Sequence, residues 1–415
     1  MNRITKRLCV SATALLLTAG LFACQSVSKP QMTSSSETTA TSVPTVPATT
    51  ATTTSAPIFT PSATTVPTTI VQTTTTETTT IQTTTAQTTT QTTTEATTVD
   101  IFALGIEPPT ESNAAEPLQI ATYDGYNQPC HPKVLYFADG WNGYRYWMAY
   151  TPYPYCEDSL ENPCIAVSDD GYTWFAPTGI RNPVTGYPPT FADSAHYSDP
   201  HLLMNGDTME LWFRYNPSLG DGVNADSNGA IILRTCSTDG ITWSEIEEMY
   251  CGSAVRDPIL SPVVELIDGT YTMWYAKRDG RIYQTASADG FTWSELTQTD
   301  LVAPNGVIWH QDMIRTDLGY EIVFCARPSG AQSNLHGLTL YYAASYDGVH
   351  FTDPIEIVAP RVGTDAFDNA SIYRASIVKI DGFYRIYYSS MSERYIWKIS
   401  LCEGESISSL KGMGR

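Results

Sequence analysis

The chain has 415 residues, and its 43 acidic residues outnumber its 23 Lys and Arg residues, which gives a formal net charge of −20 at pH 7. A chain this acidic repels phosphate groups, so its charge argues against a nucleic-acid partner. The length leaves room for one all-β domain of more than about 250 residues beside other segments.

Residues 1–23 predict a lipoprotein signal peptide. Arg3, Lys6 and Arg7 precede an apolar run that is too short to cross a bilayer as a permanent helix. The run ends in Leu21-Phe-Ala-Cys24, which resembles the lipobox of bacterial lipoproteins, where the cysteine is lipidated and becomes the new N-terminus. We therefore expect Cys24 to anchor the protein to the outer face of the bacterial cell membrane. A plain cleaved signal followed by a chance cysteine is the alternative.

Residues 24–99 predict a disordered linker. Threonine dominates this segment, and the only charged residues from Gln31 to Val99 are Glu37, Glu77 and Glu95. Its few apolar side chains cannot offset the entropy lost on ordering, so we expect an extended stalk of the kind that carries O-linked sugars. Fully extended, such a stalk reaches on the order of 200 Å, which is enough to carry a domain through a cell wall.

Residues 100–415 contain a repeated pair of apolar runs with strand character. The pairs cover 131–137 with 144–150, 199–203 with 209–215, 257–264 with 271–276, 308–314 with 320–326, and 373–378 with 384–388. Glycine lies between the members of each pair, as in a hairpin loop. With two more strands expected in each unit, the pattern predicts an all-β fold, a five-bladed β-propeller of four-stranded antiparallel blades.

The frame Ser-x-Asp-Gly-x-x-aromatic occurs four times in this domain, starting at Ser168, Ser237, Ser287 and Ser345. In an up-and-down blade, the turn between strands three and four lies on the face opposite to the start of strand one. We expect a structural role for these turns, in which Asp binds turn amides, Gly supplies a positive φ, and the aromatic side chain packs against the blade. Any chemistry should then lie at the other mouth of the ring, where titratable residues recur at the heads of the inner strands.

The heads of two inner strands, Ser198-Asp-Pro-His201 and Arg256-Asp-Pro-Ile259, and the third-strand ending Ala286-Ser-Ala-Asp-Gly290 resemble the five-bladed propeller glycosidases, the arabinanase/xylosidase and invertase-like group. The resemblance covers about residues 118–402. It implies an Asp base or nucleophile heading blade one, an Asp that tunes a partner's pKa, and a Glu acid heading a later blade. This chain departs from that pattern, because His131 heads blade one and no inner strand begins with Glu. Asp257 matches the tuning Asp best.

Glycoside hydrolysis requires one carboxylic acid to protonate the leaving oxygen and one carboxylate to activate water or attack carbon. The candidate catalytic carboxyls at the mouth are Asp199, Asp257, Asp312 and Glu161. We predict that Asp199 is the base, that Asp257 steers pKa values, and that Asp312 or Glu161 is the acid. The alternative for each is a structural role, since Asp-Pro commonly caps the entry to a strand.

Basic and aromatic residues at the same mouth are candidates for binding the sugar. They are His131, His201, Arg214, Lys277, His310, Arg327, Arg374, Trp309 and Tyr153. The cations either neutralise the carboxylates or hold an anionic sugar group, and the aromatic rings can stack on sugar rings. The histidines have no third close ligand in the sequence, so we predict no metal site and no cofactor, and Ca²⁺ on the propeller axis is left open.

The sequence therefore predicts a monomeric, extracellular, cell-surface glycoside hydrolase acting on polysaccharide or oligosaccharide. Two alternatives remain. A non-catalytic glycan-binding propeller is favoured by the missing Asp and Glu, and a sialidase-like hydrolase of an anionic sugar is favoured by the Asp-Gly-aromatic turns and the arginines. The scattered cysteines indicate neither a disulfide framework nor a zinc site, and Cys156 with Cys164 is the one candidate disulfide.

Overall fold

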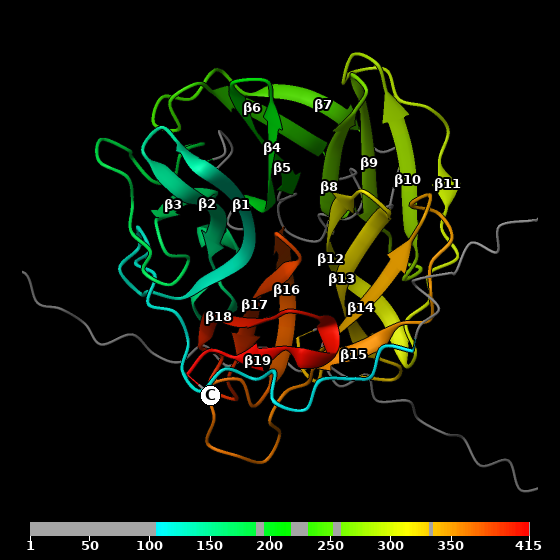
Figure 1. Cartoon of the computed structure of the whole chain (residues 1–415). Helices are drawn as coiled ribbons and strands as arrows, with labels where there is room; N and C mark the ends of the chain where they lie inside the picture. Colours follow the sequence, from blue (N-terminus) through cyan, green and yellow to red (C-terminus); the bar gives the residue numbers. More distant parts are fainter. Residues whose placement is uncertain (1–104, 188–194, 217–230, 252–258, 332–334, 415) are drawn as a thin grey trace, which may run out of the picture. The chain divides into compact units, whose positions relative to one another are not determined.

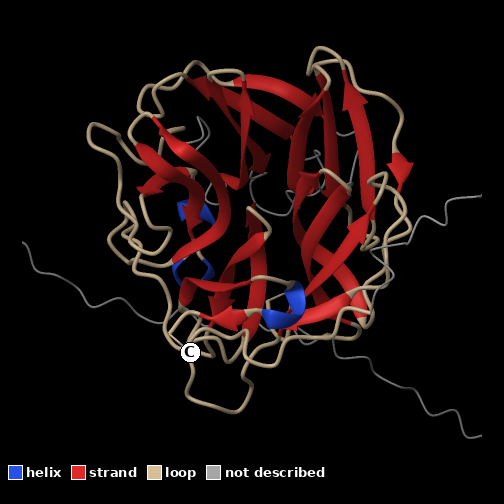
Figure 2. Ribbon diagram, in the orientation of Figure 1, coloured by secondary structure: helices blue, strands red, loops and turns tan. Residues whose placement is uncertain are grey.

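The computed structural model describes residues 105–414, except for 188–194, 217–230, 252–258 and 332–334. The described strands form five antiparallel sheets arranged around a centre, with short 3-10 turns as the only helical segments among the described residues (Figures 1 and 2). This confirms the predicted all-β, five-bladed propeller. Residues 1–104 lie outside the described residues. The lipidation of Cys24 and the linker of residues 24–99 therefore stay predictions. No helix in the described part of the chain is both long enough and apolar enough to span a membrane.

Each blade is formed by consecutive strands of the chain. Blade one contains β1 (Pro129–Trp141), β2 (Tyr144–Pro152) and β3 (Cys164–Ser168), and blade two contains β4 (His196–Asn205), β5 (Thr208–Asn216), β6 (Ile231–Ser237) and β7 (Glu247–Cys251). Blade three contains β8 (Leu260–Ile267), β9 (Thr270–Ala276), β10 (Ile282–Ser287) and β11 (Thr297–Gln298). Blade four contains β12 (Gly306–Thr316), β13 (Gly319–Pro328), β14 (Thr339–Ser345) and β15 (Ile355–Val358). Blade five contains β16 (Ser371–Ile380), β17 (Phe383–Met391), β18 (Trp397–Gly404) and β19 (Lys411–Gly412).

The inner strands β1, β4, β8, β12 and β16 contact one another in that order, and β16 contacts β1, so the ring closes. Blade one has three strands, and the isolated bridge between Val167 and Phe175 takes the place of a fourth. The segment that precedes blade one pairs with blade five, since Glu111 bridges Lys411 and the Leu118 amide donates to the Ile399 carbonyl at 2.9 Å. Pairing between the two ends of the domain fastens the ring without leaving a free sheet edge there.

Three short 3-10 turns complete the described structure: η1 (Pro154–Cys156), η2 (Asp158–Leu160) and η4 (Ile407–Ser409). The first two lie in the long connection between β2 and β3, which carries Tyr153 and Glu161 toward the starts of the inner strands. Cys156 and Cys164 flank this connection and are both free thiols. The candidate disulfide between them is therefore not formed in the structure.

The four Ser-x-Asp-Gly turns have the predicted structural role. In each turn the Ser hydroxyl accepts a hydrogen bond from the Gly amide at 2.8 Å. The Asp carboxylate accepts hydrogen bonds from the amides of the two residues after Gly at 2.7–2.8 Å. The turns also fasten neighbouring blades, because a buried aromatic residue of the second strand lies against the turn of the next blade. Trp274 Nε1 donates to the Gly348 carbonyl at 2.9 Å, and the Tyr387 hydroxyl donates to the Gly171 carbonyl at 3.1 Å.

The contact between Gly240 and the Trp147 ring can be tested by substitution. A methyl group there would lie 2.2 Å from the Trp147 ring, and the φ of Gly240 is +72°. We expect Gly240→Ala to lower the free energy of unfolding by about 2–4 kcal/mol, because it combines overpacking with a left-handed backbone. Gly206→Ala is the matched control, since Gly206 has a φ of +58° but no atom within 4 Å of the new methyl. It should cost about 1–2 kcal/mol. Urea unfolding measures both losses, and equal losses would contradict the contact.

Candidate functional site

A β-bulge interrupts the pairing of every inner strand close to its first residues. The shifts in register lie between Cys130 and Lys133, Ser198 and His201, Leu260 and Val263, Ile308 and His310, and Ile372 and Ala375. Bulges of this kind bend a strand and turn side chains in a new direction. Five of them at one level of the ring aim the residues they contain at a common space.

Three of the bulges share a dipeptide in which the second residue is proline: His131-Pro132, Asp199-Pro200 and Ser261-Pro262. The first residue of each has a positive φ of 55°, 52° and 47° respectively. Proline has no amide proton to donate to the strand ladder, so it fits a position where pairing is already interrupted.

This alignment revises the sequence prediction for blade three. Asp257-Pro258 was expected to head the inner strand, but Ser261-Pro262 occupies the position equivalent to Asp199-Pro200 in β8. Asp257 itself lies outside the described residues. Two X-Pro dipeptides stand close together before the same apolar run, and only their alignment with His131-Pro132 distinguishes them.

The starts of the inner strands enclose a cavity of about 530 Å³, called the upper cavity below. It is lined by the predicted residues His131, Tyr153, Glu161, Asp199, Arg214, Trp309, His310 and Arg327, and also by Asp158, His196, Asn216, Leu260, Arg278, Leu335 and Tyr373. The upper cavity lies at the mouth opposite to the Asp-Gly turns, because those turns follow the ends of the third strands. The structure therefore brings most of the predicted site residues together.

Asp199 is an ionised carboxylate at the base of the upper cavity. Its Oδ2 lies 3.4 Å from Arg214 Nε, and its Oδ1 lies 3.3 Å from His310 Nδ1 and 3.7 Å from Arg374 Nη1. Burial alone would raise the pKa of Asp199, but His310 and Arg214 outweigh burial and hold the pKa well below its usual range. Arg374 is fully buried and donates Nη2 to the Pro200 carbonyl at 2.8 Å. Its guanidinium therefore contacts Asp199 and the backbone of β4. The sequence predicted that Arg374 would bind the sugar, but it does not line the upper cavity.

Glu161 is the second carboxyl group of the upper cavity, and its environment is the opposite of that of Asp199. Its side chain is buried, and its Oε2 lies 3.9 Å from His131 Nδ1. Burial, with the nearby charges of Asp158 and Asp199, raises the pKa of Glu161 well above its usual value. Within the upper cavity, the surroundings thus favour the ionised form of Asp199 and the protonated form of Glu161.

Two histidines and Asp199 form a cluster that sequence reasoning missed. One donor atom each from His131, Asp199 and His310 lie within 4.8 Å of one another, and all three residues are buried. Burial lowers the pKa of both histidines and so favours the neutral form of each ring, although the charge of Asp199 opposes this. His131 Nε2, His310 Nε2 and Asp199 Oδ1 have no hydrogen-bond partner among the described residues. The sequence argument against a metal depended on a missing third ligand, and Asp199 supplies it from another blade.

Asp312 and His201 lie one layer deeper along the channel and do not line the upper cavity. Asp312 is fully buried, accepts Lys133 Nζ at 2.7 Å, and accepts the Ile377 amide at 3.1 Å. His201 Nε2 donates to the Val264 carbonyl at 2.9 Å. Of the two residues predicted as the acid, Asp312 is thus held in an internal ion pair away from the upper cavity, whereas Glu161 lines that cavity.

Lys277 was also predicted to bind the sugar, but its Nζ lies over the Tyr283 ring, 4.4 Å from the ring centroid. The next residue, Arg278, lines the upper cavity in its place. Both residues lie in the turn that follows β9 (Thr270–Ala276), where the alternation of side chains along the strand no longer predicts which one faces the cavity.

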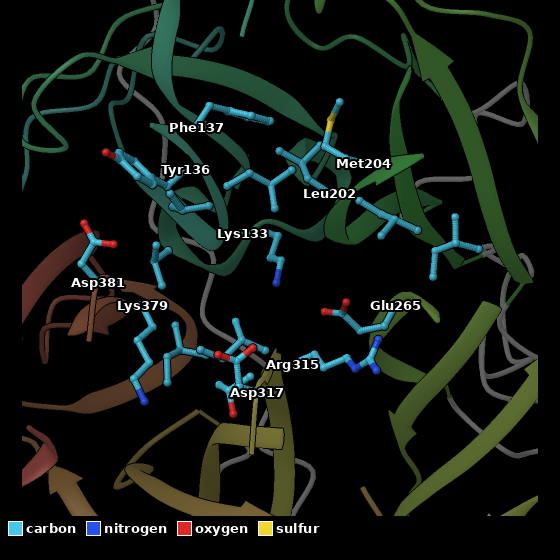
Figure 3. A pocket seen from close by; sticks show the side chains of 18 of the residues that line it. Lys133, Tyr136, Phe137, Leu202, Met204, Glu265, Arg315, Asp317, Lys379 and Asp381 are labelled. Atoms are coloured by element: carbon cyan, nitrogen blue, oxygen red, sulfur yellow. The ribbon is translucent and has the colours of Figure 1, made fainter. Parts of the chain in front are cut away.

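A second and larger cavity of about 920 Å³ lies at the other end of the inner strands and is called the lower cavity below. Figure 3 shows the side chains of Lys133, Glu265 and Arg315 directed toward its central space. Lys133 is already bound to Asp312. The histidine cluster of the upper cavity is absent from the residues that line the lower one, so the upper cavity is the stronger candidate for catalysis.

Glu265, which lines the lower cavity, should make the free energy of unfolding depend on pH. Burial raises the pKa of Glu265 from 4.5 to about 7, so the folded protein holds a proton that the unfolded chain has already released. The stability from this proton is fully present below about pH 4.5 and is lost as the pH rises through 7. Glu265→Gln should raise the free energy of unfolding at pH 8 by up to about 3 kcal/mol, and by less where water reaches the half-buried side chain. Thermal unfolding should show that the variant and the wild type are about equally stable at pH 5. A variant that is less stable than the wild type at pH 8 would contradict the prediction.

No family model matches the chain. A curated relative, the A type blood N-acetyl-α-D-galactosamine deacetylase of Flavonifractor plautii, is 28% identical over 324 residues, which cover 64% of this chain and 40% of the relative. The chain thus spans less than half the length of this relative.

Solved structures show the same architecture. The crystal structure of an N-acetylgalactosamine deacetylase from F. plautii in complex with blood group B trisaccharide matches with a TM-score of 0.59 and 22% identity, covering 74% of this chain and 98% of that chain. A structure described as a glycoside hydrolase matches with a TM-score of 0.50 and 15% identity, covering 72% and 92%. By its fold, the chain is a five-bladed propeller of the type shared by these solved proteins, as the sequence resemblance implied.

Proposed function

We propose that the chain is a carbohydrate-active hydrolase with its active site in the upper cavity, and that it removes the acetyl group from an N-acetylated sugar. The cluster of His131, Asp199 and His310 carries this proposal. Two neutral imidazoles and a carboxylate are the donor set of a hydrolytic metal site, and the curated relative with a deacetylase activity supports the choice of reaction.

The donor set passes a simple test of fit. Three atoms that bind one ion at about 2.1 Å each lie at most about 4.2 Å apart, so the observed limit of 4.8 Å requires only a small contraction. The unsatisfied Nε2 atoms of His131 and His310 and the unsatisfied Oδ1 of Asp199 are buried polar atoms that an ion would satisfy. A divalent ion held there would supply Lewis-acid polarisation of the acyl group.

The remaining groups of the upper cavity suit the proton transfers of amide hydrolysis. Water adds to the acyl carbon and gives up a proton, and the C–N bond breaks as the departing amine takes up a proton. Glu161 retains a proton because burial raises its pKa, and it lines the cavity. The Tyr373 hydroxyl accepts Trp309 Nε1 at 2.9 Å, and burial raises the pKa of Tyr373 well above its usual value. Its own proton is therefore free to be donated to the acyl oxygen.

Hydrolysis of an O-glycosidic bond is the second candidate. The opposite pKa shifts of Glu161 and Asp199 favour it, since a protonated acid and an ionised carboxylate are the two groups that this reaction requires. In this case Glu161 protonates the leaving oxygen and Asp199 activates water or attacks carbon. Asp312 takes no part in either reaction.

Product analysis distinguishes the candidates. The full chain is incubated with an oligosaccharide that ends in N-acetylgalactosamine, and acetate, free amine and new reducing ends are measured with and without EDTA. Equal amounts of acetate and amine, lost with EDTA, support deacetylation. New reducing ends without acetate support glycoside hydrolysis. Binding of the sugar without any product supports the non-catalytic alternative, and release of sialic acid from a parallel sialoside substrate supports the sialidase-like one.

We also propose that the enzyme acts outside the cell, as a monomer held by the lipid on Cys24 and the linker of residues 24–99. The motif Leu21-Phe-Ala-Cys24 and the threonine-rich composition support this location. Labelling with radioactive palmitate, present in the wild type and lost in Cys24→Ala, tests the anchor.

A further inference from the structure

Each histidine of the cluster has a buried hydroxyl against its Nδ1 atom. Thr151 Oγ1 lies 2.8 Å from His131 Nδ1, and Ser261 Oγ lies 2.6 Å from His310 Nδ1. Both hydroxyl residues are fully buried, and neither lines the upper cavity. The two histidines thus have the same arrangement, built from different blades.

The origins of the two hydroxyls are fixed by the strand register. Thr151 lies in β2, opposite Cys130 at the bulge of β1, which places it beside His131. Ser261 lies in the bulge of β8 with a φ of 47°, a left-handed conformation that non-glycine residues adopt rarely. Its backbone amide also donates to Asp199 Oδ2 at 3.3 Å. Ser261 therefore contacts both Asp199 and His310.

We propose that Thr151 and Ser261 are positioning residues that keep the proton of each imidazole on Nδ1, so that both Nε2 lone pairs face the upper cavity. A neutral imidazole carries one proton, and a hydrogen bond made by one ring nitrogen decides which nitrogen keeps it. Asp199 Oδ1 lies 3.3 Å from His310 Nδ1, and its negative charge favours a proton on that nitrogen. Both Nε2 atoms are buried without a hydrogen-bond partner among the described residues, so a proton on either Nε2 would have no acceptor there.

The two hydroxyls also fix the directions of the rings. The ring centroids of His131 and His310 lie 5.3 Å apart, and the Tyr373 ring lies 5.5 Å from the first and 4.3 Å from the second. A ring held at Nδ1 and packed against Tyr373 has little freedom to turn Nε2 away from the cavity. Loss of either hydroxyl leaves one imidazole able to exchange tautomers and to rotate.

The inference rests on the proposed function only in treating the two histidines as ligands, and the test separates the two. Proton-detected nitrogen NMR of the metal-free full chain with labelled histidine reports the tautomer directly. Zn²⁺ affinity, measured by calorimetry, reports its consequence. We expect the Nδ1–H tautomer for His131 and His310 in the wild type, a mixture at His131 in Thr151→Val and at His310 in Ser261→Ala, and a 10- to 100-fold lower Zn²⁺ affinity in each variant.

Two further variants control for structure. Thr151→Ser keeps the hydroxyl and should restore the tautomer of His131 and the Zn²⁺ affinity. Ser389→Ala removes a buried hydroxyl that accepts the His131 backbone amide at 3.0 Å but does not contact the ring, so it should change neither. An Nε2–H tautomer in the wild type, or unchanged tautomers in folded Thr151→Val and Ser261→Ala, overturns the inference. Expected tautomers without Zn²⁺ binding in the wild type support the inference and count against the metal in the proposed function.

Discussion

Asp199→Asn is expected to lower kcat/KM for sugar hydrolysis by about 10³-fold, the loss typical of removing a central acid, base or charge-stabilising group. The variant removes the negative charge that faces Arg214, His310 and Arg374. Either proposed reaction depends on that charge, as a ligand in deacetylation or as the base or nucleophile in glycoside hydrolysis. Steady-state release of acetate or of reducing ends measures the loss.

The matched control is Asp289→Asn, which makes the same chemical change in an Asp-Gly turn on the opposite face. Asp289 accepts the Phe291 and Thr292 amides, so its replacement should weaken a turn and leave kcat/KM unchanged. Circular dichroism must show that Asp199→Asn is folded, because two cations lose their partner. A folded Asp199→Asn variant with more than about a tenth of wild-type kcat/KM would exclude a catalytic role for Asp199.

Lys133→Met is expected to give the largest loss of stability, about 3–5 kcal/mol. Its Nζ lies 2.7 Å from Asp312 Oδ1, and neither side chain is exposed by more than 3%. The substitution leaves the Asp312 carboxylate buried without its counterion, and desolvation of that charge is the source of the loss. Urea unfolding at pH 7 measures the free energy of unfolding.

Lys411→Met provides the comparison, since Lys411 Nζ lies 3.6 Å from Glu111 Oε2 and both side chains are more than half exposed. That variant should lose at most about 1 kcal/mol because water replaces the ion pair. The double variant Lys133→Met/Asp312→Leu should recover most of the stability that Lys133→Met loses, because it removes the uncompensated charge. Equal losses for Lys133→Met and Lys411→Met would contradict a buried axial ion pair.

The fold could be predicted because its signals are local. Each inner and second strand carries its own alternation of apolar residues, and each Ser-x-Asp-Gly frame closes through hydrogen bonds within a few residues, as at Ser168 and Gly171. These patterns can be recognised in each repeat without knowledge of its contacts with the other blades. Counting them along the chain was sufficient to predict five blades and the face on which the turns lie.

The site was only partly predictable, because the local sequence does not show how deep within the ring each inward-facing residue lies. His310 and Asp312 are two residues apart on one strand and both face inward, yet one lines the upper cavity and the other binds Lys133 below it. The β-bulges change the register at this point, and no single strand shows where they lie. The repeated dipeptides His131-Pro132, Asp199-Pro200 and Ser261-Pro262 were the signal that, once aligned, would have identified Ser261.

The cluster of His131, Asp199 and His310 could not be found from any one repeat. Its members come from blades one, two and four, and ring closure alone brings them within 4.8 Å. The buried state of Glu161 is likewise set by the packing of the β2–β3 connection over the inner strands.

A crystal structure of the full chain with an oligosaccharide ending in N-acetylgalactosamine tests the central claim most directly. The account predicts that the terminal sugar occupies the upper cavity, with its acetamido group against Asp199, His310 and Tyr373. A sugar bound in the lower cavity, or on the outer surface with the upper cavity free of sugar, would contradict it.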